Sequence, residues 1–228
     1  MEKPIILKEN IDTLMESRFI KVFDLKYAPG RHYYDASRRS LDNLVAHKSD
    51  EEFKAMLPDA VSCFVILKIA NEAPKLLTSY EFRYPTGQFL LSPPAGLIDP
   101  EDANLSSVTD GVRPQDAAIL SAAAREIKEE TGLELKETDR LFVVNPLLFS
   151  SPGMTDESNA LACAVIAIDD TSALCQTGAV GSELFDGFSL LSQDEAREII
   201  KRGCDEHGNY FSVYTWCALM YFVSGMWE

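Results

Sequence analysis

The stretch Ala122-Ala-Ala-Arg-Glu-Ile-Lys-Glu-Glu-Thr-Gly-Leu133 decides the fold. It closes a predicted helix over Pro114–Thr131, because proline suits a first helical turn and glycine suits the position after the last one. At about 100° per residue, one apolar stripe of this helix is expected to be buried. Its members are Leu120, Ala124, Ile127 and Thr131.

Two acids of this helix, Glu126 and Glu130, are four residues apart and project from one flank. Like charges at that spacing cost a helix about 0.2–0.5 kcal/mol per pair, and a hard divalent cation would remove that cost. On spacing alone, a solvated acidic face is the simpler interpretation. Acids near a helix C-terminus oppose its dipole, however, which argues against it.

Two segments resemble the Nudix box. Arg125-Glu-Ile-Lys-Glu-Glu-Thr-Gly-Leu133 matches the second half, R-E-U-x-E-E-x-G-U with U apolar. Pro94-Ala-Gly-Leu-Ile-Asp99 resembles the opening of the box in the ADP-ribose pyrophosphatase branch. The resemblance implies an α/β fold, a Nudix-type α/β/α sandwich with a mixed sheet, which hydrolyses a pyrophosphate bond.

The same resemblance implies a metal site for Mg2+, with Mn2+ as a possible substitute. Glu126 and Glu130 would be metal ligands, and the main-chain carbonyl of Ala95 would complete the sphere. Glu129 would be a third ligand or would hold Arg125. We therefore count Glu129 and Arg125 among the catalytic residues.

The box is interrupted in this chain. The family places its glycine about fourteen positions before its arginine, whereas Gly96 and Arg125 are 29 apart, so about fifteen residues are inserted near Glu101–Arg113. The first box glutamate has no clean match: counting from Gly96 gives Asp102 and counting back from Arg125 gives Ala117, and we assign the role to neither Asp102 nor Glu101. A polar insertion beside the site suits a flap.

The loop Ser151–Glu157 resembles one that often supplies the general base in this branch, so Glu157 is the predicted base, with Asp156 as the reserve. An exposed acidic turn explains this loop equally well. Arg83 resembles a strand residue that contacts substrate phosphate, although a surface charge at a strand end is nearly as good an explanation.

The N-terminal region reads as a small β appendage, with residues 1–57 forming appendage and linker and residues 58–228 the hydrolase domain. In dimeric relatives such a strand contacts the nucleobase, so Tyr34 and Arg39 are predicted to bind substrate. An ordinary strand is the slightly preferred alternative. A lone hairpin cannot bury its own apolar face, so we expect a homodimer that uses this appendage.

Further elements follow from apolar alternation, turn residues and capping boxes. Strands are predicted over Phe19–Tyr27, His32–Arg39, Ser62–Ile69, Leu76–Tyr84, Phe89–Leu91, Leu141–Phe149 and Leu161–Ile168, and further helices over Gln193–Arg202 and Phe211–Met226.

The composition limits the kinds of molecule that the chain is expected to bind. A net charge of −15 disfavours nucleic acid and anionic lipid as partners, and no apolar run reaches the roughly 20 residues that span a membrane. Five scattered cysteines without a CxxC pair suggest a reducing cytoplasm.

The expected function is therefore Mg2+-dependent hydrolysis of a nucleoside diphosphate derivative, with ADP-ribose giving AMP and ribose 5-phosphate as the best match. The alternatives are a hydrolase of other nucleotide sugars or dinucleotides, and a ligand sensor of the same fold without catalysis. A DNA-binding sensor would need a basic module, which the sequence does not indicate.

Overall fold

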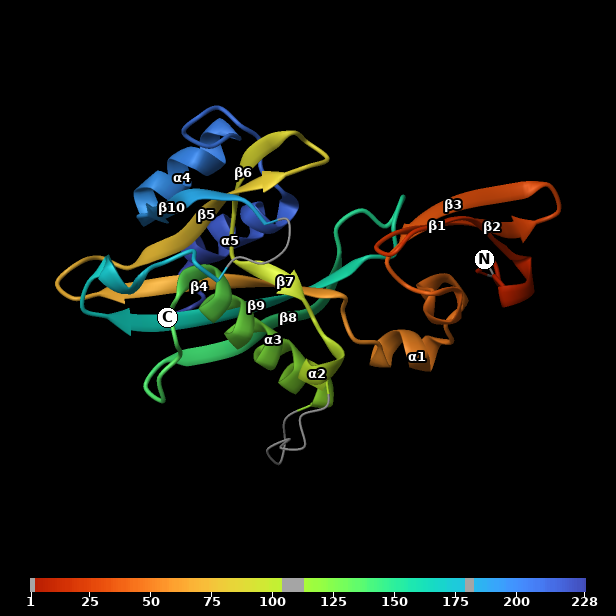
Figure 1. Cartoon of the computed structure of the whole chain (residues 1–228), viewed down its shortest axis with the longest axis horizontal. Helices are drawn as coiled ribbons and strands as arrows, with labels where there is room; N and C mark the ends of the chain where they lie inside the picture. Colours follow the sequence, from red (N-terminus) through yellow and green to blue (C-terminus); the bar gives the residue numbers. More distant parts are fainter. Residues whose placement is uncertain (1–2, 104–112, 179–182) are drawn as a thin grey trace. The chain divides into compact units, whose positions relative to one another are not determined.

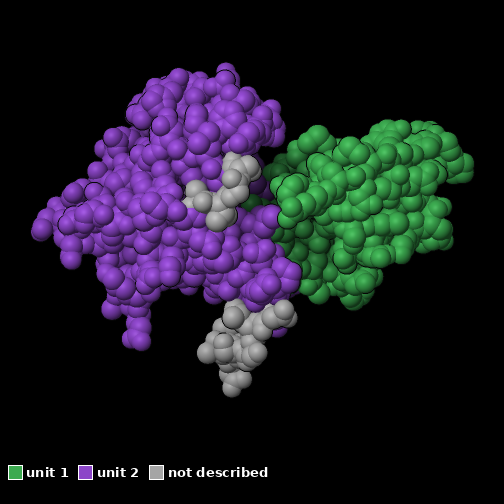
Figure 2. Space-filling model, in the orientation of Figure 1, with its two compact units in different colours: residues 1–59, 147–159 green, residues 60–146, 160–228 purple. Residues whose placement is uncertain are grey.

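The computed structural model describes residues 3–103, 113–178 and 183–228. The chain forms two compact units (Figure 2): unit 1 comprises residues 1–59 and 147–159, and unit 2 comprises residues 60–146 and 160–228. The segment 147–159 includes the loop Ser151–Glu157, so the acids of that loop belong to unit 1. Among the described residues, no helix is long and apolar enough to cross a membrane.

Unit 2 is built on a seven-stranded sheet with the central order β10-β5-β4-β9-β8, to which β6 adds beside β5 and β7 beside β4. The strands are β4 (Ala60–Ile69), β5 (Lys75–Arg83), β6 (Gln88–Ser92), β7 (Ala95–Leu97), β8 (Arg140–Phe149), β9 (Ser158–Ile168) and β10 (Phe185–Leu191).

Helices cover both faces of this sheet (Figure 1). Alternate residues of β4 show the two layers: Cys63 contacts the carbonyl of Ala123 on one face, and Phe64 meets Tyr221 on the other. The helices are α2 (Pro100–Ala103), α3 (Pro114–Thr131), α4 (Gln193–Arg202) and α5 (Val213–Ser224). The predicted α/β/α sandwich is therefore confirmed.

Helix α3 has the predicted bounds, with Pro114 in its first turn and Gly132 in the left-handed conformation at its end. Its buried stripe is rotated from the predicted one, because Leu120 and Ala124 are only half-buried. The residues that pack into the core are Ile119, Ala122, Ala123 and Ile127. The rotation leaves Glu126 and Glu130 at the edge of the buried face, and both are buried.

Unit 1 holds a three-stranded antiparallel sheet in the order β1-β2-β3, formed by β1 (Ile11–Glu16), β2 (Lys21–Ala28) and β3 (Arg31–Ser37). It has its own small core of Ile11, Phe23, Leu25 and Leu44. Helix α1 (Asp50–Ala55) follows, and Ser49 and Glu52 cap its N-terminus reciprocally. The small N-terminal sheet was predicted, but its first strand, β1, was not.

Two strands of unit 2 were also missed by the sequence reading. Strand β7 has only three residues, too few for an alternating pattern, and β10 contains Gly187 at positive φ, which interrupts its pattern. The short β7 matters most, because its pairing with β4 aligns Ala95 with Ser62 and Gly96 with Val61. That register fixes the first half of the predicted box beside α3.

Candidate functional site

The two halves of the interrupted box meet where β7 passes α3. The backbone N–H of Ala95 donates to Oε1 of Glu130 at 3.3 Å. A Cβ atom placed on Gly96 would lie 1.9 Å from Oε1 of Glu126, so any larger residue here would displace the Glu126 carboxylate. The insertion in sequence therefore does not separate the two halves in space.

Arg125 connects helix α3 to the chain that follows β7. One terminal nitrogen, Nη1, donates to Glu126 at 2.6 Å and to Glu129 at 3.3 Å, and the other, Nη2, donates to the carbonyl of Leu97 at 2.8 Å. Partial burial opposes the charge of Arg125, but its carboxylate partners outweigh burial and raise the pKa of the guanidinium. Glu129 does hold Arg125, which is one of its two predicted roles.

Asp102 is the carboxylate that completes this network. Its Oδ2 accepts from Nη2 of Arg125 at 3.0 Å, and its Oδ1 accepts from the hydroxyl of Ser121 at 2.9 Å. Helix α2 turns Asp102 inward, and the side chain is buried, while Glu101 is exposed. Asp102, the residue reached by counting from Gly96, therefore contacts the arginine of the second half of the box. Most of the insertion, residues 104–112, lies outside the described residues.

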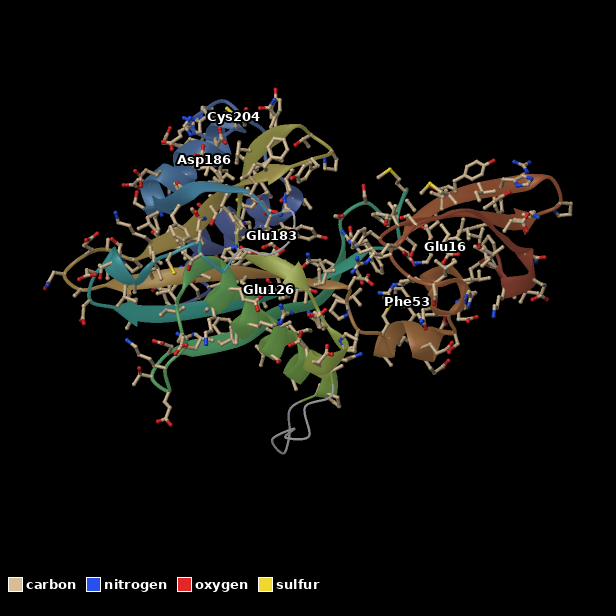
Figure 3. The ribbon with its side chains drawn as sticks, in the orientation of Figure 1. Glu16, Phe53, Glu126, Glu183, Asp186 and Cys204 are labelled. Carbon is tan, nitrogen blue, oxygen red and sulfur yellow. The ribbon has the colours of Figure 1, made fainter. Side chains whose placement is uncertain are left out.

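Four carboxylates gather around the buried end of this site. Burial, together with the neighbouring charges of Glu81, Glu126 and Glu183, raises the pKa of Glu130 to about 9. Burial also raises the pKa of Glu126 and of Glu81, and Glu183 acts on both in the same direction. Figure 3 shows Glu126 and Glu183 in unit 2. Without a cation, ionising all of these acids at once would carry a large free-energy cost.

The donor set suits a hard divalent cation in kind, because carboxylate oxygens are the ligands that Mg2+ prefers. A cation would let Glu126 and Glu130 ionise together, which burial otherwise disfavours. No three Asp, Glu, His or Cys side chains among the described residues converge tightly enough to hold a metal ion as they stand. Glu126 instead pairs with Arg125, and Glu130 accepts from Ala95.

Arg83 lies at the end of β5 and pairs with Glu81, two residues earlier on the same face of the strand. Glu81 lies on the same side of the sheet as Ser92, because Ser79 pairs with Ser92 in the β5–β6 register. Ser92 is the last residue of β6, three positions before Ala95. Glu81 thus brings a carboxylate to that region from the neighbouring strand.

The remaining predicted site residues belong to unit 1. Glu157 pairs with Arg38, and Tyr34 is exposed on β3. Arg39 is largely buried, and its guanidinium donates to Asp59 at 2.8 Å and to the hydroxyl of Ser158 at 3.2 Å. Arg39 therefore stabilises the loop region of unit 1, and its contact with a nucleobase stays a prediction, as do the roles of Glu157 and Tyr34.

Three residues of the acidic site were missed as site residues by sequence reasoning: Asp102, Glu81 and Glu183. The spacing from Gly96 pointed to Asp102, and the strand period placed Glu81 on the face of Arg83. Glu183 comes just before the unpredicted strand β10, so no local pattern could have indicated it.

No family model matches the chain. A curated relative, Nudix hydrolase 14, chloroplastic, from Arabidopsis thaliana, is 30% identical over 105 residues, which is 43% of this chain and 29% of that protein. The chain thus covers under a third of that relative's length. The match confirms the predicted resemblance to Nudix hydrolases in this region.

Two solved structures resemble this chain. The structure described as an ADP compounds hydrolase has a TM-score of 0.53 at 18% identity, over 96% of this chain and 92% of that one. A C. elegans Ap4A hydrolase in a binary complex has a TM-score of 0.42 at 17% identity, over 72% of this chain and 96% of that one. The first of these shares the architecture of this chain, an α/β fold of the Nudix type.

Proposed function

We propose that this chain hydrolyses the pyrophosphate bond of a nucleoside diphosphate derivative in a Mg2+-dependent reaction, with ADP-ribose giving AMP and ribose 5-phosphate. The observation that carries the proposal is the meeting of β7 and α3, where Gly96 leaves room for Glu126 and Ala95 binds Glu130. The fold neighbour described as acting on ADP compounds supports this substrate class.

The metal would be held by Glu126 and Glu130, with Glu129 and the carbonyl of Ala95 as further ligands. It supplies positive charge to the pyrophosphate, which a chain of net charge −15 would otherwise repel. Mn2+, also an oxygen-seeking cation, would serve in its place. Arg125 and Asp102 keep the helix and the loop in register. Arg83 would contact a substrate phosphate once it leaves Glu81.

Two glutamates compete for the role of general base. Glu157 remains the prediction from the loop Ser151–Glu157. Glu183 is the second candidate, because its charge acts on Glu126, Glu130 and Glu81 within unit 2. The base must come within hydrogen-bond reach of the attacking water, and a group acting only in the transition state changes kcat more than KM.

The base is tested with Glu157→Gln and Glu183→Gln at saturating Mg2+. We expect the variant of the true base to lower kcat by about 100-fold or more with little change in KM, while the other variant keeps at least about a third of the activity. Glu101→Gln, which removes an exposed acid outside the network, is the control. If both variants retain full turnover, neither glutamate is the base.

The overall function is tested by assaying the purified protein on ADP-ribose, ADP-glucose, a diadenosine polyphosphate and NADH, with Mg2+ and with excess chelator. We expect ADP-ribose to be cleaved fastest and chelator to abolish cleavage. Glu130→Gln should lose turnover by orders of magnitude and also lose the thermal stabilisation by Mg2+, while Glu134→Gln, exposed and beyond the helix, should lose neither.

The alternatives give different outcomes in the same assay. Preference for another nucleotide sugar or a dinucleotide keeps the chemistry and changes the substrate. Binding of ADP-ribose without cleavage by the intact protein would favour a ligand sensor of the same fold. Full hydrolysis in excess chelator would contradict the proposal.

We also propose a homodimer that uses unit 1, located in a reducing cytoplasm. The free cysteines Cys63, Cys163, Cys175, Cys204 and Cys217 are compatible with that compartment. Large apolar side chains exposed at the β1–β2 turn support a protein partner there: Leu14, Met15, Phe19 and Ile20.

A further inference from the structure

Unit 1 contains a pocket of about 350 Å3, whose lining includes Tyr34 and Asp156 but none of the acids of the site in unit 2. Its floor is one face of the small sheet, where Leu25 pairs in register with Tyr33, and Asp35 follows two residues later on the same face. A pair of stacked rings, Phe53 of α1 and Phe149, lines its wall, with ring centroids 6.0 Å apart. Figure 3 labels Phe53 in this unit. The volume lies at the lower end of the range for small-molecule sites, roughly 300–1,000 Å3.

Two carboxylates line this otherwise apolar pocket. Asp35 is only 6% exposed, and its Oδ1 accepts from the backbone N–H of Asp156 at 3.1 Å. Oδ2 of Asp156 accepts from the backbone N–H of Val45 at 3.1 Å. The other oxygen of each, Oδ2 of Asp35 and Oδ1 of Asp156, is buried and has no hydrogen-bond partner in the described part of the chain. Buried acceptors of this kind are costly unless a donor reaches them.

The charge around these acids is not balanced within unit 1. Arg39 is the nearby cation, but its guanidinium is bound to Asp59 at 2.8 Å and lies 3.9 Å from Asp156. Asp59 and Asp156 thus share the one guanidinium, and no ion pair is found for Asp35 among the described residues. Burial, together with the charge of Asp156, raises the pKa of Asp35 to about 6, so near neutral pH this acid is mostly ionised and unpaired.

We propose that the pocket binds a primary ammonium group carried on an apolar or aromatic body. The ammonium N–H groups would donate to the unpartnered oxygens of Asp35 and Asp156, and the body would lie against Tyr33, Phe53 and Phe149. A phosphate-bearing ligand is disfavoured, because the surplus negative charge of the pocket repels it. A bare metal ion would leave the aromatic wall unused.

The test is calorimetric titration of the full chain, near neutral pH, with phenethylammonium and with its uncharged counterpart, phenethyl alcohol. We expect the ammonium compound to bind at least about tenfold more tightly than the alcohol, as a charged hydrogen bond to a buried carboxylate implies. Equal affinities, or no binding of the ammonium compound at millimolar concentration, would overturn the proposal.

Two variants keep the test specific. Asp35→Asn should weaken ammonium binding by about tenfold or more and leave the alcohol unaffected. Asp24→Asn is the matched control, because Asp24 is a buried acid of the same sheet that pairs with His32 and does not line the pocket, and it should bind as the wild type does. Equal losses in both variants would contradict a site at Asp35.

A third variant guards against a folding defect in Asp35→Asn. Phe53 is 43% exposed, so Phe53→Leu should fold normally while removing one aromatic wall, and it should weaken both compounds. Displacement of phenethylammonium by AMP would assign the pocket to a nucleotide and would also overturn the proposal.

Discussion

Arg125 is the residue on which the geometry of the acidic site depends most. It binds carboxylates on α3 and on α2 and a carbonyl at the end of β7, so it links three elements. A bidentate guanidinium holds such partners in a fixed plane, which lysine cannot do. The position of Glu126 is thereby coupled to residues on the far side of the insertion.

Asp102 and Asp99 allow this coupling to be tested with matched variants. Asp102 is buried and lies 3.0 Å from Nη2 of Arg125, while Asp99 is 54% exposed and lies 3.5 Å from the same atom. We expect Asp102→Asn to lower the free energy of unfolding by about 1.5–3 kcal/mol and to reduce kcat, since the pair is shielded from water. Asp99→Asn should change the unfolding free energy by less than about 1 kcal/mol.

Denaturant titration of the two variants measures these differences, and Asp102→Glu should recover part of the loss by restoring the charge. If Asp102→Asn leaves stability and kcat unchanged, or if Asp99→Asn loses as much stability, Asp102 does not hold the site in place.

At the scale of elements, the sequence predicts those helices whose ends carry local signals. The bounds of α3 follow from Pro114 and Gly132, and those of α4 follow from the capping box of Ser192 and Glu195. The final helix, α5, is shorter than predicted because Ser212 caps its start and Gly225 ends it. Strand β7 carried no such signal, and it forms because β4 offers it an edge.

The residues of the acidic site also divide into those that local sequence signals predict and those that only the tertiary fold brings together. Glu126, Glu129, Glu130 and Arg125 share one helix, so their common location could be read from spacing. Glu81 and Glu183 reach the same acids from β5 and from the segment before β10, and only the tertiary fold brings them there. The rotation of the buried stripe had the same cause, because the packing of α3 on the sheet, and not its apolar residues alone, sets which side is covered.

The sheet of unit 1 and its loop give a pH-dependent stability. The pKa of Asp35 is raised to about 6 by burial and by Asp156, so the folded form holds this proton more tightly than the unfolded chain does. Its contribution to stability is complete below the unfolded pKa of about 4 and is lost as pH rises through about 6. The charged groups facing it are Asp156 and, beyond it, Arg39 with Asp59.

We therefore expect Asp35→Asn to remove this decline, so that the variant gains stability relative to the wild type between about pH 4 and pH 7. Denaturant unfolding of both proteins across this range measures the difference between their free energies of unfolding. The titration of all other groups cancels in that difference. A difference that is constant with pH would contradict the assignment.

At the scale of the whole molecule, the exposed apolar turn of unit 1 predicts self-association. Light scattering at micromolar concentration should give twice the chain mass of 25.3 kDa. Phe19→Asp should shift the protein to monomer, because a charge placed in an apolar contact is costly to desolvate. Tyr210→Asp is the control, since Tyr210 is an exposed aromatic residue of unit 2. A wild-type protein that is monomeric throughout would refute the dimer.

The hydrogen bond between Asp102 and Arg125 has a practical consequence for protein engineering. It links α2, which precedes residues 104–112, to α3, which follows them, so the network around the acids of α3 reaches both sides of that segment. Lengthening a loop whose ends are already held costs only about 0.6 kcal/mol for each doubling. A fluorescent reporter inserted between α2 and α3 would therefore be flanked by two elements of the acidic site, and its emission could follow ligand binding there in living cells.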